Sequence, residues 1–319
     1  MTNIEFDRDY IKTDSLEKYI YLYISANRYI GMLARTGRSD ATLTSYTSTM
    51  RTLIQAIGSF KGEDARLEDL TEEDIYEIMR IIGGRERTLK WRFIIFGQWV
   101  EFQTGSNIIR NMKILWNAEE PDRTFITLDE YKRILSLTRN DTERLIVCLG
   151  AQMGLRMHEI AAIKIADISD GQLIVSGKGH GRGKVVRMRI PESLQRMIAD
   201  YLRNERRRIL LETEEPDVGI LLLNRNGRER GAIMTPSAIT RIYQRISDDL
   251  GYRVTSHVMR RLYCTVLADE GGLRSDLDTL RRMMRHEQIG TTLSCYLNAD
   301  PDRMNEAQSK LEAAFGFSN

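Results

Sequence analysis

Apolar residues recur at helical spacing through the first part of the chain. They fall three or four positions apart, and so share one side of a helix, within residues 16–33, 43–57, 75–82 and 89–100. Four amphipathic helices of this kind can bury their apolar sides against one another. We therefore predict a compact helical bundle over residues 15–110, preceded by an N-terminal extension of residues 1–14.

Capping residues and glycines predict where these helices begin and end. Ser15 is a candidate N-cap for the first helix, and Thr71 opens the third. Gly58, Gly83 and Gly105 follow the second, third and fourth apolar runs. Glycine commonly ends a helix, because it adopts the left-handed conformation at little cost.

The helical periodicity is lost over residues 111–124, which are the best linker candidate and contain Glu119-Glu120-Pro121-Asp122. Thr127 and Glu130 then have the spacing of a capping box and open a new helical run. We predict a second domain over residues 125–300 and a C-terminal tail over residues 301–319.

The second domain mixes helices with a little strand. Residues 172–176 and 184–190 have the pattern of a hairpin around a glycine-rich turn, and residues 219–223 are predicted as a third strand. Residues 142–153 and the chain from Pro236 onward are predicted to be helical. The expected fold class is therefore mainly α with a small antiparallel β-sheet.

Basic residues are concentrated in two segments, although the formal net charge of the chain is only +2. Residues 85–92 are basic and contain Trp91; they are either a solvated helix end or a surface for DNA phosphates. Residues 171–190 contain five Lys/Arg and no Asp/Glu, which suits insertion toward a phosphate backbone. Local charge, rather than net charge, indicates a nucleic-acid partner.

The cysteines indicate a reducing compartment. Cys148, Cys264 and Cys295 are odd in number and unclustered, which favours neither a disulfide framework nor a zinc site. The first residues lack the pattern of a signal peptide, and no run approaches the roughly 18 apolar residues that span a bilayer. We expect a cytoplasmic protein without a membrane partner.

Six residues in the second half of the chain could together cut a phosphodiester without a metal ion. Arginines bind the two non-bridging oxygens bidentately. A lysine or histidine can protonate the leaving 5′-oxygen, and a tyrosine hydroxyl can hold the phosphate covalently. In chain order the candidates are Arg156, Lys178, His257, Arg260, His286 and Tyr296.

Order and spacing carry this interpretation, because each residue alone is weak evidence. An isolated arginine is usually a surface charge, and a tyrosine on a helix is usually in the core. His257 and Arg260, however, are three positions apart and share a helix face, and Tyr296 is the last tyrosine of the chain. His158 and His180 are interpreted as bystanders.

The segments around these residues resemble the tyrosine recombinases, the integrase family that includes Xer and Cre. The resemblance is carried by Gly154-Leu155-Arg156-Met157-His158-Glu159-Ile160, Ser176-Gly177-Lys178-Gly179, His257-Val258-Met259-Arg260, and His286 through Tyr296. It covers residues 123–299 strongly, whereas the N-terminal bundle is similar only in being helical, basic in places and of suitable size.

The resemblance implies a role for each site residue. Arg156 and Arg260 would bind the phosphate, and Tyr296 would be the nucleophile. Lys178 in the hairpin turn would be the general acid, with Lys184 as its rival. The two histidines of the set would assist proton transfer or orient the phosphate, and Glu159 would help to organise the site.

The chain departs from the family pattern at two points. The second histidine of the family usually follows Leu-Gly, whereas Met284 and Arg285 precede His286 here. The interval from His286 to Tyr296 is also one residue longer than usual. A bulge or loop after Thr292 would absorb the extra residue.

By the same resemblance, residues 15–110 are a core DNA-binding domain and residues 125–300 a catalytic domain, together clamping duplex DNA. Met304, Ala307, Leu311 and Phe315 form one apolar stripe in the tail. The stripe either packs on its own domain or, as the family pattern favours, docks into a neighbouring protomer of a tetramer on two DNA sites.

The implied function is site-specific recombination through a 3′-phosphotyrosyl intermediate, with no cofactor and no metal. The alternatives are DNA relaxation in the manner of a type IB topoisomerase, or a catalytically inactive DNA-binding relative. The resemblance admits chromosome-dimer resolution as well as integration or excision of a mobile element, and it admits accessory proteins.

Overall fold

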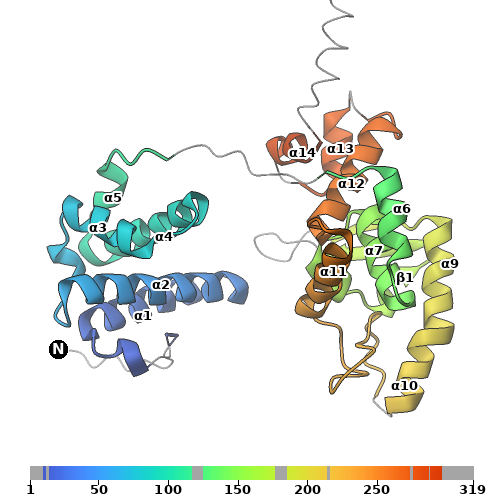
Figure 1. The fold of residues 1–319 in the computed structure, drawn as a ribbon, viewed down its shortest axis with the longest axis horizontal. Helices are drawn as coiled ribbons and strands as arrows, with labels where there is room; N and C mark the ends of the chain where they lie inside the picture. Colours follow the sequence, from blue (N-terminus) through green and yellow to red (C-terminus); the bar gives the residue numbers. More distant parts are fainter. Residues whose placement is uncertain are drawn as a thin grey trace, which may run out of the picture. The chain divides into compact units, whose positions relative to one another are not determined.

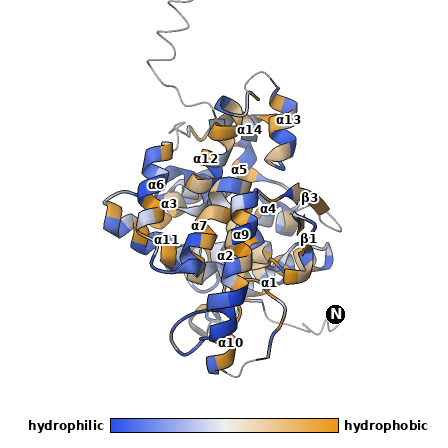
Figure 2. Ribbon diagram, turned by 90° about the vertical axis from the view of Figure 1, so that its right-hand side faces the viewer, coloured by the Kyte–Doolittle hydropathy of each residue, from blue (hydrophilic) through white to orange (hydrophobic). Residues whose placement is uncertain are grey.

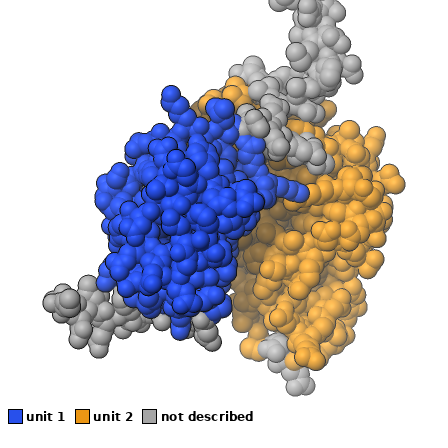
Figure 3. All heavy atoms as spheres, turned by 60° about the vertical axis from the view of Figure 1, so that its left-hand side comes forward, with its two compact units in different colours: residues 1–121 blue, residues 122–319 orange. Residues whose placement is uncertain are grey.

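The chain forms two compact units, Met1–Pro121 and Asp122–Asn319 (Figure 3). The structure is a computed structural model that describes residues 10–11, 14–116, 125–176, 185–213, 216–273, 276–286 and 288–296. Within these ranges the side chains of residues 14, 176 and 294–296 are not described.

Helices are the only regular elements among the described residues of the first unit (Figure 1). Short 3-10 turns at Asp14–Leu16 and Leu67–Asp69 accompany α1 (Ile20–Arg35), α2 (Asp40–Lys61), α3 (Glu72–Ile82), α4 (Glu86–Thr104) and α5 (Ile108–Asn111). The largest fully buried side chains of its core are Trp99, Phe93 and Phe96 from α4. The Trp99 Nε1 donates to Ser25 Oγ at 3.0 Å, which satisfies the one polar atom of this buried ring.

Two of the predicted helix boundaries in this unit are wrong. The first helix begins at Ile20 rather than after Ser15, because residues 14–16 form a separate 3-10 turn. Gly58 does not end α2 but lies inside it, and Gly62 ends it instead. A Cβ atom on Gly58 would overlap the ring of Tyr19, so this glycine permits close packing within the helix.

The other predicted helix starts and ends in this unit are confirmed. Thr71 caps α3 as part of a capping box with Asp74, and Gly83 follows the last residue of that helix. Gly105 ends α4 in the left-handed conformation. Trp91 is 46% exposed on α4, as its basic surroundings suggested.

The second unit combines one small sheet with a larger number of helices (Figure 1). Its helices are α6 (Leu128–Ser136), α7 (Asp141–Met153), α8 (Met157–Ala161), α9 (Glu192–Tyr201), α10 (Arg207–Thr213), α11 (Pro236–Leu250), α12 (Ser256–Asp269), α13 (Leu277–Met283) and α14 (Ile289–Tyr296). A π-helical turn, Leu202–Arg206, joins α9 to α10, and a 3-10 turn at Ile165–Asp167 precedes the sheet.

The sheet is antiparallel with strand order β1-β2-β3, formed by Ile168–Ser169, Gln172–Ser176 and Val185–Arg189. The predicted hairpin of β2 and β3 is confirmed, with Gln172 opposite Arg189 and Ser176 opposite Val185. Residues 219–223 are not the third strand. They form only isolated bridges, because Leu221, Leu222 and Leu223 are buried in the helical core and their backbone pairs with loops.

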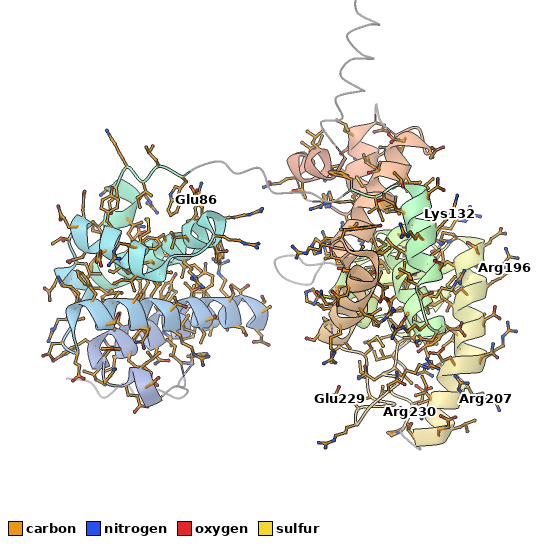
Figure 4. The ribbon with its side chains drawn as sticks, viewed as in Figure 1. Glu86, Lys132, Arg196, Arg207, Glu229 and Arg230 are labelled. Atoms are coloured by element: carbon orange, nitrogen blue, oxygen red, sulfur yellow. The ribbon has the colours of Figure 1, made fainter. Side chains whose placement is uncertain are left out.

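Helix α7 lies at the centre of the second core, and nearly all of its residues are buried. The predicted capping box of Thr127 and Glu130 begins α6, and Gly154 ends α7. Figure 2 shows helices with one hydrophobic and one hydrophilic side, and Figure 4 shows charged residues such as Lys132, Arg196 and Arg207 projecting outward.

Among the described helices, none is both long enough and apolar enough to cross a membrane.

Candidate active site

The turn after α7 brings the first candidate arginine toward α12. Gly154 adopts the left-handed conformation (φ 57°), and a Cβ atom there would overlap the ring of Tyr263 on α12. Its carbonyl oxygen accepts hydrogen bonds from Arg260 and, at 3.2 Å, from Arg285. Glycine is therefore needed here for both the turn and the close approach.

Arg156 is the residue before α8 and is fixed by Glu159. Its backbone N–H donates to Glu159 Oε2 at 2.8 Å, and its Nη1 donates to Oε1 at 2.9 Å. The arginine side chain is 32% exposed, whereas that of Glu159 is 6% exposed. The carboxylate therefore anchors a guanidinium group whose remaining surface faces solvent.

Arg260 joins three segments that are distant in the sequence. It lies on α12, is 5% exposed, and donates to the carbonyl oxygens of Gly154 and Met284. His257 lies one turn earlier on α12 and is exposed, so the predicted helical pair is present with one buried and one exposed member.

His286 lies between α13 and α14 and is 7% exposed. Its Nδ1 is 3.0 Å from the hydroxyl of Thr292, which is buried on α14. Helix α14 packs against both α12 and α13 (Figure 1). The histidine is thus held by the helix that ends at Tyr296.

The positive charges of Arg156 and Arg260 act on both His257 and His286. Burial lowers the pKa of His286 to about 4, assisted by the charges of Arg260, Arg156 and Arg285. Partial desolvation also lowers the pKa of His257, with the charges of Arg261, Arg260 and Arg156 acting in the same direction. Both imidazole rings are therefore neutral near pH 7.

Glu159 remains ionised in this field. Burial raises the pKa of its carboxyl, but the charge of Arg285 and the hydrogen bonds and charge of Arg156 outweigh burial, and the net pKa is lowered. A buried carboxylate between two guanidinium groups is well compensated.

Arg285 is the site residue that sequence reasoning missed. Its side chain is 6% exposed and donates to Glu159 Oε2 at 2.6 Å. The available signal was its position before His286, where the family usually has glycine. That signal was interpreted only as a departure from the pattern.

The interval between His286 and Tyr296 also differs from expectation. Helix α14 continues without a bulge or loop from Ile289 to Tyr296, so the expected interruption after Thr292 is wrong.

Several predicted residues lie outside what the structure describes. These are the hairpin residues Lys178, His180 and Lys184, the tail of residues 301–319, and the side chain of Tyr296. His158 is exposed on α8 and contributes the smallest of the charge effects on His257. Within the described ranges, no group of three or more His, Cys, Asp or Glu side chains is placed to hold a metal ion.

The described residues can bind a phosphate group. Two guanidinium groups, from α12 and from the turn before α8, lie with two neutral imidazoles in one positive field. Arginine recognises phosphate oxygens with two parallel hydrogen bonds, and neutral imidazole can accept a proton.

Known proteins match the second unit most clearly. Residues 124–303 match the model of the family described as "Phage integrase family". Tyrosine recombinase XerA from Thermococcus onnurineus is 26% identical over 194 residues, covering 60% of this chain and 64% of the relative. Transposase A from transposon Tn554 of Staphylococcus aureus is 22% identical over 300 residues, covering 91% of this chain and 75% of the relative. The chain thus spans about three fifths of the length of the XerA relative.

Solved structures extend the similarity of fold to most of the chain. A lambda integrase dimer bound to a COC′ core site has a TM-score of 0.67 at 18% identity, covering 87% of this chain and 96% of that chain. A lambda integrase tetramer bound to a Holliday junction has a TM-score of 0.66 at 18% identity, covering 86% and 77%. Because the family model spans more than half of the 319 residues and the fold agrees, the chain belongs to the phage integrase family.

Proposed function

We propose that this chain is a site-specific DNA recombinase that cuts and rejoins duplex DNA through a 3′-phosphotyrosyl intermediate. The observation that carries the proposal is that Arg260, on the same helix as His257, donates to the carbonyl oxygens of Gly154 and Met284, which lie two residues before Arg156 and His286. These residues come from the turn before α8, from α12 and from the α13–α14 turn. A phosphodiester is the substrate that such a set binds and activates.

In this proposal Tyr296 attacks the scissile phosphorus. The new bond joins the tyrosine oxygen to phosphorus, the bond from phosphorus to the 5′-oxygen breaks, and Lys178 supplies the proton to that oxygen. Lys184 is the alternative donor. Tyrosine has an ordinary pKa of about 10, so the positive field also favours the nucleophilic phenolate. A 5′-hydroxyl from another duplex reverses the step and reseals the strand without ATP.

The two histidines have a more limited role in the DNA-free protein. Both are neutral near pH 7, since their pKa values are lowered by desolvation and by the nearby arginines. Neutral imidazole can accept the proton of the tyrosine or hydrogen-bond a phosphate oxygen, but it adds no positive charge. The charge that opposes the growing phosphate charge therefore comes from Arg156 and Arg260.

The two units have different proposed tasks. The first unit would bind duplex DNA through basic residues such as those beginning α4, and the second would perform the chemistry. The lambda integrase tetramer on a Holliday junction supports a tetramer on two DNA sites for this chain. In such a tetramer, residues 301–319 would link the protomers. The protein would act in the cytoplasm, wherever its DNA resides, with or without accessory proteins.

The test is to recover covalent adducts between the purified chain and fragmented, nicked genomic DNA, and then to rebuild the recovered site as two duplexes. Covalent adducts followed by strand exchange between the duplexes are expected. Adducts with supercoil relaxation and no exchange would favour a topoisomerase. Duplex binding without any adduct would favour an inactive DNA-binding relative.

A further inference from the structure

A third guanidinium group is built into the site beside the two proposed phosphate ligands. Arg285 adopts a left-handed backbone conformation (φ 55°), which non-glycine residues rarely take. Its Nη2 donates to Glu159 Oε2 at 2.6 Å and to the Gly154 carbonyl at 3.2 Å. Its Nη1 lies 2.9 Å from the sulfur of Met188 on β3.

Both acceptors of Arg285 are shared with the proposed phosphate ligands. Glu159 uses Oε1 for the Arg156 side chain and Oε2 for Arg285 and the Arg156 backbone. The Gly154 carbonyl accepts from Arg260 as well as from Arg285. Arg285 therefore shares the Glu159 carboxylate with Arg156 and the Gly154 carbonyl oxygen with Arg260.

This sharing limits how tightly Glu159 can hold Arg156. An unshared carboxylate would form two parallel hydrogen bonds with a neighbouring guanidinium group. Because Oε2 accepts from both Arg285 and the Arg156 backbone, the Arg156 side chain engages the carboxylate through Nη1, and its Nη2 and Nε make no hydrogen bond to the described residues. Those two donors are left for a ligand such as phosphate.

We propose that Arg285 is a positioning residue of the recombination site. It fixes the Glu159 carboxylate and the Gly154 carbonyl, and through them it orients Arg156 and Arg260 toward the scissile phosphate. The inference rests on the proposed function, because the phosphate is the group toward which the arginines are oriented.

The left-handed backbone conformation of Arg285 allows a substitution that removes only the side chain. Glycine adopts a positive φ readily, so Arg285→Gly removes the side chain without adding backbone strain. Arg285→Lys keeps the charge but loses the planar pair of donors. Asp170→Gly is the matched control, because Asp170 is the other described non-glycine residue with positive φ (50°) and lies in the turn between β1 and β2.

The experiment compares these variants on the nicked duplex recovered with the wild-type chain. We expect Arg285→Gly to lower the single-turnover cleavage rate at saturating protein by about 100-fold, as small misplacements of catalytic groups do. Duplex affinity should stay within about threefold. Arg285→Lys should recover part of the rate, and Asp170→Gly should cleave like wild type.

The outcomes separate this inference from the proposed function. Wild-type cleavage with equal cleavage by Arg285→Gly would overturn the inference and leave the function standing. If the wild-type chain cleaves no duplex, the proposed function fails. The positioning role of Arg285 is then tested by ¹⁵N spectra of the Arg156 and Arg260 side chains. Unchanged guanidinium signals in Arg285→Gly would overturn the inference. If Arg285→Gly does not fold, Arg285→Lys decides, because a wild-type rate in that variant would overturn the inference.

Discussion

At the scale of single residues, the site depends on how buried charges are compensated. Glu159 is enclosed, yet it stays ionised because Arg156 and Arg285 flank it. Arg285 contacts it from a left-handed backbone conformation, which costs a non-glycine residue about 1–2 kcal/mol. The ion pair offsets that cost. Removing one partner of a buried pair typically destabilises a protein by about 3–5 kcal/mol.

Sequence reasoning could assemble the candidate list of this site but not its hydrogen bonds. Helical spacing placed His257 and Arg260 together, and glycine after α7 placed the turn before Arg156. The role of Arg285 depends on a positive φ and on contacts across more than 120 positions of the chain. Neither local pattern nor propensity contains that information.

His286 predicts a pH dependence of stability. Its pKa falls from the ordinary 6.5 to about 4 on folding, so the unfolded chain binds the proton more tightly. The stabilising contribution is complete above pH 6.5 and is lost as the pH falls toward 4, by about 2 kcal/mol between pH 7 and pH 5. His286→Gln should remove this part of the dependence. Urea unfolding at both pH values, followed by far-UV circular dichroism, measures it; identical pH dependence in both proteins would contradict it.

Lys178 can be tested by changing the leaving group. If it protonates the 5′-oxygen, Lys178→Ala should cut an ordinary duplex about 10²–10⁴-fold more slowly than wild type. A 5′-bridging phosphorothiolate should restore the rate, because a thiolate leaves without an acid. Lys184→Ala is the matched control and should need no rescue. Equal impairment of Lys178→Ala on both substrates would transfer the role to another residue.

At the scale of elements, local signals predicted helix ends well where the ends depend on neighbours in sequence. The helix start at Thr71, the capping box at Thr127 and the stops at Gly83, Gly105 and Gly154 are all present. Errors arose where tertiary contacts decide. Residues 219–223 look like a strand because they are apolar, but their leucines are buried by helices.

Gly58 is the clearest case of such a contact. Glycine to alanine inside a helix usually stabilises by up to about 1 kcal/mol. At Gly58 the new methyl group would overlap the buried ring of Tyr19, so Gly58→Ala should instead destabilise by about 1–3 kcal/mol. Gly31 in α1 is the matched control, because a Cβ there meets atoms at ordinary distances of 3.6 and 3.7 Å. Gly31→Ala should be stabilising.

Tryptophan fluorescence during urea unfolding reports on this pair of variants. All three tryptophans, Trp91, Trp99 and Trp116, lie in the first unit, so the signal follows that unit within the full chain. Equal shifts of the unfolding midpoint in both variants would show that Tyr19 does not constrain Gly58.

At the scale of the whole molecule, the proposed function requires protomers to meet on DNA. The apolar stripe of Met304, Ala307, Leu311 and Phe315 lies just beyond the proposed nucleophile, where it could enter a neighbouring protomer. Burying a leucine or phenylalanine side chain contributes roughly 1.5–3 kcal/mol each. The tail could therefore decide whether protomers associate.

Truncation after Asp300, or Leu311→Asp with Phe315→Asp, should spare folding and duplex binding but reduce tetramer formation and strand exchange. Ser309→Asp with Ala313→Asp adds the same charge on the opposite side of the predicted helix and should behave like wild type. Sedimentation of protein–DNA complexes and a recombination assay measure the two effects. Wild-type assembly and exchange by the truncated chain would contradict the protomer-exchange model.

The central claim is that Tyr296 becomes covalently joined to a DNA 3′-phosphate. The most direct measurement is mass spectrometry of the covalent adduct after digestion with nuclease and trypsin. Cleavage after Arg285 and Arg303 releases residues 286–303, in which Tyr296 is the single tyrosine. The account predicts a nucleotide linked through its 3′-phosphate to that peptide, and no adduct from Tyr296→Phe. A nucleotide on any other peptide, or an undiminished adduct in Tyr296→Phe, would contradict it.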